Sequence, residues 1–227
     1  MGALSSYGLV PAGWPTLLVG VLSGLLGGLA AGWATPRWLE RPDRLRGWSV
    51  LLFVLWMAAL GGLAAQVSDG ITPHFWARLL FVLILSAASL VDLYEKLIPD
   101  ELVMVGLILG GILLLIGPFP GGPPLLALAG ALTALALLFL IFWLARGGFG
   151  FGDVKLAAVI GLFLGFPWAL LGLVLAFVGG GFLGGVLLLT RVVGRRSTLP
   201  FGPWLALGAI VTTLWGQQIW AWYMGIY

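Results

Sequence analysis

The stretch Gly150-Phe151-Gly152-Asp153-Val154-Lys155 stands directly before a long apolar run. That run, Leu156 to Thr190, has 35 residues and no charged side chain. At about 1.5 Å of rise per residue it exceeds the roughly 30 Å hydrocarbon core of a bilayer by a wide margin. Because Gly165-Phe166-Pro167-Trp168 offers a turn, we expect two membrane helices here. The first is short, from about Asp153 to Gly165.

Composition assigns the chain to membrane proteins. Of its 227 residues, 61% are hydrophobic and only 8% are charged, whereas soluble domains carry roughly a quarter of charged residues. Lipid cannot satisfy open backbone groups, so such a chain spans the bilayer as helices. We therefore predict an all-α polytopic bundle of about eight transmembrane helices. It forms a single membrane-embedded domain, residues 1–227, without a separate soluble domain.

Six further apolar runs complete the predicted bundle. They cover about 9–34, 49–67, 75–91, 101–116 and 125–144, and a last run from the Leu199–Pro203 stretch to about Tyr223. Two of the eight predicted helices carry a small residue at every fourth position, which favours close helix packing. These positions are Gly20, Gly24, Gly28 and Gly32 in the first helix, and Gly172, Ala176, Gly180 and Gly184 in the seventh.

The distribution of basic residues predicts the orientation. The loops 36–47, 92–100, 146–155 and 191–196 alternate along the predicted bundle and hold ten of the eleven Lys and Arg residues. Positive charge accumulates on the cytoplasmic side of membrane proteins. We therefore expect these four loops in the cytoplasm and both termini outside, in a multi-pass protein of the inner membrane.

The residues that are absent exclude several kinds of chemistry. Without cysteine there is no thiol nucleophile and no thiolate metal site. His74 is the only histidine, so a Ser-His-Asp relay depends on that one residue. A net charge of +3, scattered along the chain, does not indicate nucleic-acid binding. We expect no cofactor and no metal.

Two aspartates remain as the candidate catalytic groups. Asp92 closes one apolar run and Asp153 opens another, and the predicted topology places both at the cytoplasmic edge. Two carboxyls that lie close together share a proton, which is the chemistry of aspartic proteolysis. Gly150 and Gly152 allow the backbone to approach a substrate strand and to adopt dihedral angles that other residues resist.

Other interpretations remain open at this point. An acid at the end of a span often caps a helix, meets lipid headgroups or interacts with the helix dipole, and capping is the role we assign to Asp100. A proton-coupled transporter would use Asp92 and Asp153 as coupling groups, although transporters usually place such acids near the bilayer midplane. A structural assembly subunit would use the glycine faces and leave Gly152-Asp153 and Lys155 unexplained.

Three motifs together resemble the type IV prepilin peptidases, which are membrane aspartic proteases of bacteria. Residues 150–156 resemble the GxGDxK signature of that family, and Asp92 with Leu97-Ile98-Pro99-Asp100 resembles its D…(I/L)PD segment. Leu199-Pro200-Phe201-Gly202-Pro203 resembles its PFGP stretch. The resemblance implies that Asp92 and Asp153 carry catalysis, with Gly150, Gly152 and Lys155 as supporting motif residues. It also implies that the enzyme removes a short basic leader from type IV prepilins or pseudopilins.

One feature departs from the family pattern. Larger members carry an extended first cytoplasmic loop with paired CxxC motifs, which is associated with N-methylation of the new pilin terminus. Here that loop is only residues 36–47 and has no cysteine. We expect a peptidase that cuts but does not methylate. The sequence identifies neither the particular pilin nor the oligomeric state.

Overall fold

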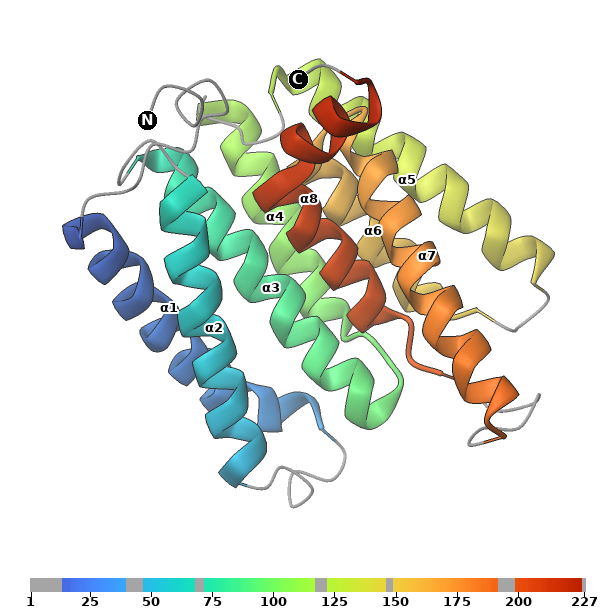
Figure 1. The fold of residues 1–227 in the computed structure, drawn as a ribbon, viewed down its shortest axis with the longest axis horizontal. Coiled ribbons are helices and arrows are strands. Elements are labelled where there is room, and N and C mark those ends of the chain that lie inside the picture. Colours follow the sequence, from blue (N-terminus) through green and yellow to red (C-terminus); the bar gives the residue numbers. More distant parts are fainter. Residues whose placement is uncertain are drawn as a thin grey trace. The chain divides into compact units, whose positions relative to one another are not determined.

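The computed structural model describes residues 14–39, 47–67, 72–116, 122–145, 149–191 and 199–225. Over these ranges the chain forms α-helices joined by short connections, without a β-strand (Figure 1). A short 3-10 helix, η2 (Thr35–Trp38), follows the first α-helix. The α-helices are α1 Trp14–Ala34, α2 Gly47–Val67, α3 Pro73–Glu95, α4 Asp100–Ile116, α5 Pro124–Leu144, α6 Phe151–Leu164, α7 Trp168–Leu189 and α8 Gly202–Tyr223. The predicted all-α fold with eight helices is confirmed.

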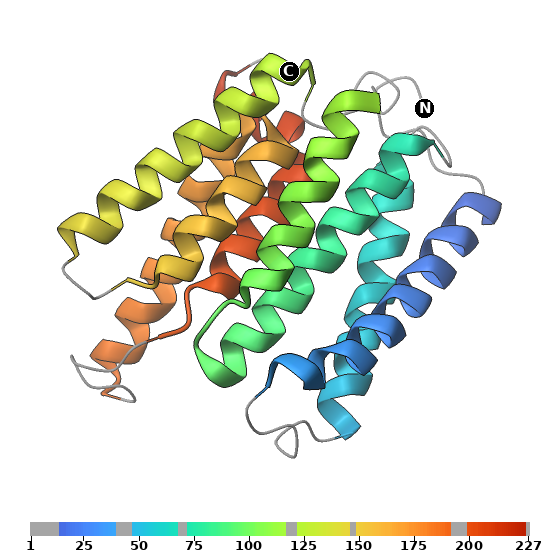
Figure 2. The same ribbon diagram turned by 180° about the vertical axis from the view of Figure 1, so that it is seen from behind.

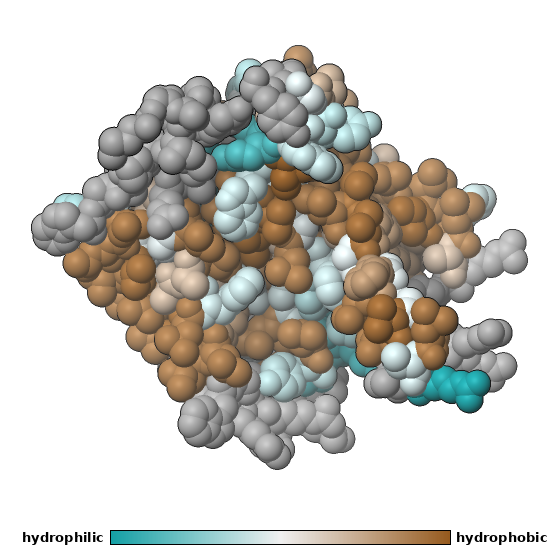
Figure 3. Space-filling view, viewed as in Figure 1, coloured by the Kyte–Doolittle hydropathy of each residue, from teal (hydrophilic) through white to brown (hydrophobic). Residues whose placement is uncertain are grey.

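Several of these helices are suited to cross a membrane. Four segments are long and apolar enough to do so by length and composition: 15–37, 73–95, 124–144 and 168–189. Large hydrophobic side chains such as Leu125, Leu132, Val178 and Phe182 are exposed on α5 and α7. The space-filling view shows hydrophobic residues over much of α1 and α7 (Figure 3). Surfaces of this kind are stable against lipid and unfavourable in water, so the chain is a polytopic membrane protein.

The chain divides into two compact units, and α3 and α8 contribute to both. Unit 1 comprises residues 1–87 and 214–227, and α1 packs against α2 within it. The predicted glycine face of α1 makes this contact. A Cβ at Gly20 would lie 2.6 Å from Ala65 Cβ, and a Cβ at Gly24 would lie 3.0 Å from Ala58 Cα. Only hydrogen atoms at these positions permit so close a helix pair.

Unit 2, residues 88–213, is built around α6. This helix packs against α4, α5 and α7, and the view from behind shows it between α4 and α5 (Figure 2). Ten of its hydrophobic and glycine residues, from Val154 to Leu164 apart from Lys155, are buried. Gly130 of α5 and Gly161 of α6 face each other so closely that a Cβ on either would collide with the backbone of the other. The helix that carries Asp153 is therefore held firmly in the interior of unit 2.

The long apolar run breaks where the sequence predicts. Helix α6 ends at Leu164, and α7 begins at Trp168. Gly165 has a φ of +70°, which favours glycine and ends the helix. The predicted small-residue face of α7 packs along α8: a Cβ at Gly180 would lie 3.0 Å from the ring of Trp204, and a Cβ at Gly172 would lie 3.6 Å from Ala209 Cα.

Helix α3 extends further than predicted. The apolar run ends at Val91, but the helix continues for one more turn to Glu95. It stops at Lys96, whose φ is +56° and whose N–H donates to the carbonyl of Asp92 at 2.9 Å. Pro99 then prevents the helix from continuing. Asp92 therefore lies inside the last turn of α3 rather than in the loop, because loss of apolar character does not by itself end a helix.

Candidate active site

Unit 2 contains both predicted catalytic aspartates at helix ends. Asp92 lies in the last turn of α3, and Asp153 lies in the first turn of α6. Their exposed fractions are only 4% and 7%. A carboxylate that leaves water loses several kcal/mol of solvation unless the protein supplies partners. The partners of these two side chains therefore determine whether each carboxyl can be charged in the folded protein.

Asp92 receives its hydrogen bond from the beginning of α8. The backbone N–H of Gly202 donates to Asp92 Oδ2 at 2.8 Å. Gly202 is the first residue of α8, so its N–H has no partner within that helix. The positive end of the helix dipole also favours a carboxyl at this position. The contact joins residues that are 110 positions apart in the chain.

Asp153 has one oxygen without a partner. Its Oδ1 is buried and makes no hydrogen bond with the residues that the structure describes. Its backbone N–H donates to the carbonyl of Gly150 at 3.2 Å, which forms the first turn of α6. A buried carboxyl oxygen without a partner is suited to accept a hydrogen bond from water or, when it is protonated, to donate one to a substrate carbonyl.

Three glycines leave space around these groups. A Cβ at Gly202 would lie 2.7 Å from Asp92 Oδ2, and a Cβ at Gly150 would lie 3.0 Å from Asp153 Oδ2. A Cβ at Gly152 would lie 3.1 Å from Ile98 Cβ. Gly150 has φ −78° and ψ 137°, which any residue can adopt. The expectation of a special dihedral angle at Gly150 was therefore wrong: the position requires a small residue for reasons of space.

Asp100 and Lys155 form an ion pair next to the site. Lys155 Nζ lies 2.7 Å from Asp100 Oδ1 and 2.8 Å from Oδ2. Asp100 was expected to cap the helix that it begins, but its observed partner is this lysine on α6. Sequence reasoning misses the pair because the two residues are 55 positions apart.

An aromatic cluster joins three segments beside Asp153 and Gly202. The ring of Phe201 lies 5.0 Å from that of Phe149 and 4.9 Å from that of Phe177, measured between centroids. Phe149 precedes α6, Phe177 belongs to α7 and Phe201 precedes α8. The cluster holds the starts of α6 and α8 against α7. The PFGP stretch was the only sequence signal for Phe201 and Gly202, and it assigned neither residue a role.

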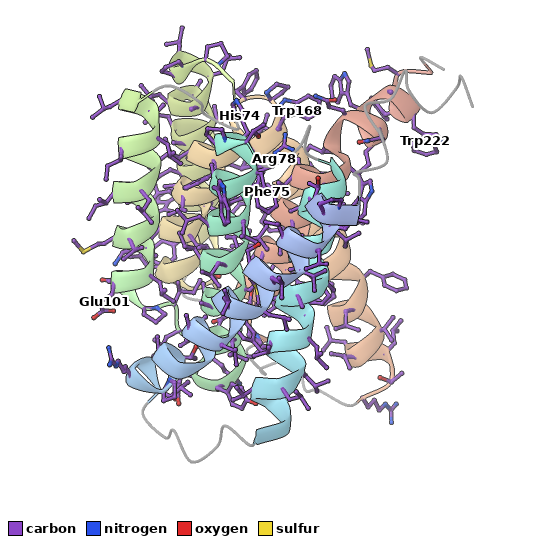
Figure 4. All side chains as sticks on the ribbon, turned by 90° about the vertical axis from the view of Figure 1, so that its left-hand side faces the viewer. His74, Phe75, Arg78, Glu101, Trp168 and Trp222 are labelled. Carbon is purple, nitrogen blue, oxygen red and sulfur yellow. The ribbon has the colours of Figure 1, made fainter. Side chains whose placement is uncertain are left out.

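The single histidine is not near Asp92. His74 is exposed at the start of α3, beside Phe75 and Arg78 (Figure 4), whereas Asp92 lies at the end of that helix. A histidine relay through Asp92 is therefore excluded. Asp92 and Asp153 are the acidic residues buried in the described part of unit 2, and one oxygen of the half-buried Glu95, Oε1, is buried there without a partner as well.

Comparison with known proteins identifies the class of this membrane protein. The protein-family model described as "Type IV leader peptidase family" matches residues 79–185, and this range includes both aspartates. Proteins named "Prepilin leader peptidase/N-methyltransferase" are similar along most of the chain. The protein from Aeromonas salmonicida is 33% identical over 82% of this chain and 67% of its own length.

Two further relatives carry the same name. The protein from Stutzerimonas stutzeri is 32% identical over 80% of this chain and 72% of its own length. The protein from Pseudomonas aeruginosa is 36% identical over 66% of this chain and 53% of its own length. No solved structure matches the chain. The chain belongs to the type IV leader peptidase family and is a protease.

The contact between Gly202 and Asp92 leads to a direct prediction. In Gly202→Ala the added methyl group would meet Asp92 Oδ2 at 2.7 Å, so the carboxyl has to move and its hydrogen bond is lost. A displacement of about 1 Å can reduce a catalytic rate about 100-fold. We expect a loss of that size in the peptidase rate of the purified protein.

The matched control is Gly111→Ala on α4, where a Cβ would have no atom within 4 Å. This variant should keep the native rate and the native melting temperature. Equal rates for Gly202→Ala and Gly111→Ala would show that the close approach to Asp92 is not needed.

Proposed function

We propose that the protein is a membrane aspartic endopeptidase in which Asp92 and Asp153 activate water. Its substrates are type IV prepilins or pseudopilins, from which it removes the short basic leader. The observation that carries the choice of residues is the burial of two carboxyls at helix ends of one compact unit. Membership of the leader peptidase family supports the reaction.

The reaction divides the work between the two carboxyls. Two neighbouring acids in a poorly solvated site do not both ionise easily, so they share one proton. The ionised carboxyl accepts a proton from water while the water oxygen attacks the scissile carbonyl carbon. The protonated carboxyl donates a hydrogen bond to the carbonyl oxygen. When the C–N bond breaks, the departing nitrogen takes the proton that the ionised carboxyl had accepted from water and becomes the new N-terminal amine, and the leader leaves with a carboxyl group that ionises in solvent.

The surroundings of the two acids suit these roles. Gly202 N–H fixes the direction of Asp92 through Oδ2. Asp153 Oδ1 has no partner in the described chain and is therefore available to water or to the substrate. Both acids lie within one turn of a helix end, whereas the coupling acids of transporters usually lie near the midplane. This position and the family membership favour proteolysis over transport.

We place the reaction at the cytoplasmic face of the inner membrane. The loops that follow Asp92 and precede Asp153 belong to the set that holds ten of the eleven basic residues. Such loops stay in the cytoplasm. A basic leader ahead of a hydrophobic segment also stays there for the same reason, so enzyme and cleavage point meet on one side.

The first prediction from this mechanism concerns the two acids. Asp92→Asn and Asp153→Asn keep the shape of the side chain but remove the charge and the transferable proton. We expect each to reduce cleavage of a prepilin substrate at least about 100-fold, as measured by the mass of the product. Glu101→Gln removes an exposed acid at the start of α4 (Figure 4) and should keep the native rate. An Asp92→Asn or Asp153→Asn protein that cuts normally would exclude that residue from the mechanism.

A second prediction is that the protein does not methylate its product. A pocket for a nucleoside-sized methyl donor typically occupies about 300 Å³ or more, and the twelve residues 36–47 provide little chain to build one. The purified protein, given a prepilin and labelled S-adenosylmethionine, should release a mature chain with an unmodified N-terminus. A product heavier by one methyl group would contradict this.

A third prediction concerns orientation. Because the chain has no cysteine, single cysteines report on their own position. Leu97→Cys, exposed in the α3–α4 connection, should react with an impermeant maleimide only from the cytoplasmic side. Trp222→Cys, exposed near the end of α8, should react only from the outside. Labelling of both from the same side would invalidate the proposed topology.

A further inference from the structure

The ion pair between Lys155 and Asp100 connects the two segments that carry the aspartates. Asp100 is the first residue of α4 and follows the end of α3 after only four residues, 96–99. Lys155 lies in the first turns of α6, two positions after Asp153. Its Nζ contacts both oxygens of the Asp100 carboxylate, at 2.7 and 2.8 Å. Through this contact the chain after Asp92 is tied to the helix of Asp153.

The pair is placed to control the rotation of α6. Residues two positions apart on a helix point in nearly opposite directions, about 200° apart. Asp153 accordingly faces the interior, whereas the Lys155 side chain is 34% exposed. Lys155 Nζ also lies 5.1 Å from the ring centroid of Phe151, one turn earlier on the same helix. Fixing the outward side chain therefore fixes the direction in which the inward carboxyl points.

Apolar packing of the buried Val154, Leu156 and Ala157 keeps this turn in the interior, and the ion pair adds a polar contact on the opposite side of the helix. Gly152 has no side chain to interlock with Ile98. Their contact therefore limits how closely α6 approaches Ile98 but does not fix the rotation of α6 about its axis. The far half of α6 is fixed by Gly161 against Gly130, about 12 Å along the helix from Asp153. Asp153 Oδ1 has no partner in the described chain, so the carboxyl is held locally only on its other side, where the Gly150 backbone lies against Oδ2.

The pair is unsuited to a mainly stabilising role. The side chain of Asp100 is 65% exposed, and exposed ion pairs add little to the stability of a fold. Geometry at a catalytic carboxyl is far more sensitive, because a displacement of about 1 Å can cost about 100-fold in rate.

We propose that Lys155 and Asp100 are positioning residues, whose ion pair fixes the first turn of α6 against the start of α4 and so aims Asp153 at the scissile bond. This proposal rests on the proposed function, in which Asp153 is a catalytic acid. Neither Lys155 nor Asp100 needs to touch the substrate. Their effect is therefore expected in kcat and not in KM.

The test measures kcat and KM for a prepilin substrate with the purified full-length protein. Lys155→Met and Asp100→Asn should each lower kcat about 10- to 100-fold and leave KM within about two-fold. The double variant Lys155→Met/Asp100→Asn should be no slower than the slower single variant, because both changes break the same contact. Lys155→Arg keeps a charged donor and should retain most of the native kcat.

Two controls separate the ion pair from charge and folding. Glu101→Gln removes the neighbouring exposed acid of the same helix turn and should leave kcat unchanged. The exchanged pair Lys155→Asp/Asp100→Lys should be faster than Asp100→Lys alone, because it restores attraction with reversed charges. The melting temperatures of Lys155→Met and Asp100→Asn should stay within about 2 °C of the native value.

Several outcomes would overturn the proposal. These are a native kcat in Lys155→Met, effects that multiply in the double variant, a loss confined to KM, or a fall in melting temperature that accounts for the lost rate. The dyad variants are measured in the same assay. If Asp92→Asn and Asp153→Asn are inactive while Lys155→Met keeps its kcat, only the positioning role fails. If either dyad variant cuts normally, the proposed function fails and takes this inference with it.

Discussion

The structure of unit 2 depends on the burial of two carboxyls in a protein that has little polar material to stabilise them. Asp92 and Asp153 are almost completely enclosed, and each buried carboxylate would cost several kcal/mol without compensation. The Gly202 N–H, which α8 leaves unpaired at its start, compensates Asp92. For the Gly202 N–H to reach Asp92, α8 has to begin against the end of α3. Helix α6 has to begin beside these two helix ends for Asp153 to lie in the same site. The close glycine contact between α5 and α6 holds that arrangement in place.

Much of the helical framework could be predicted from the sequence, because lipid permits few alternatives to a helix. The 35-residue run was too long for one span, and the turn at Gly165 to Trp168 divides α6 from α7 as expected. The glycines of α1 and α7 face neighbouring helices, since their spacing of four residues places them on one side. In these helices the residues that form the sequence pattern are also the residues that make the tertiary contacts, so the sequence alone predicts both the helix boundaries and the packing faces.

The sequence was less informative about the contacts of the site, because their partners lie far apart in the chain. Nothing near Asp92 indicates that Gly202, 110 residues later, binds it. Asp100 has the local pattern of a helix cap, yet a lysine 55 residues away is its observed partner. Gly150 was assigned a conformational role, whereas the neighbouring carboxyl explains it by space. The sequence motifs identified the residues of the site but did not predict which contacts each residue makes.

The antiparallel contact between α5 and α6 also sets a depth. Because Gly161 faces Gly130 and Phe166 N–H binds the carbonyl of Leu126, Asp153 is level with Leu138. Leu138 lies six residues before the end of α5, which corresponds to about 9 Å along the helix axis. A peptide bond that reaches Asp153 has to descend by that distance below the end of α5, and water has to follow it. Under the proposed function the segment that is cut has to be extended there, because a peptide carbonyl inside a helix is already hydrogen-bonded within the helix.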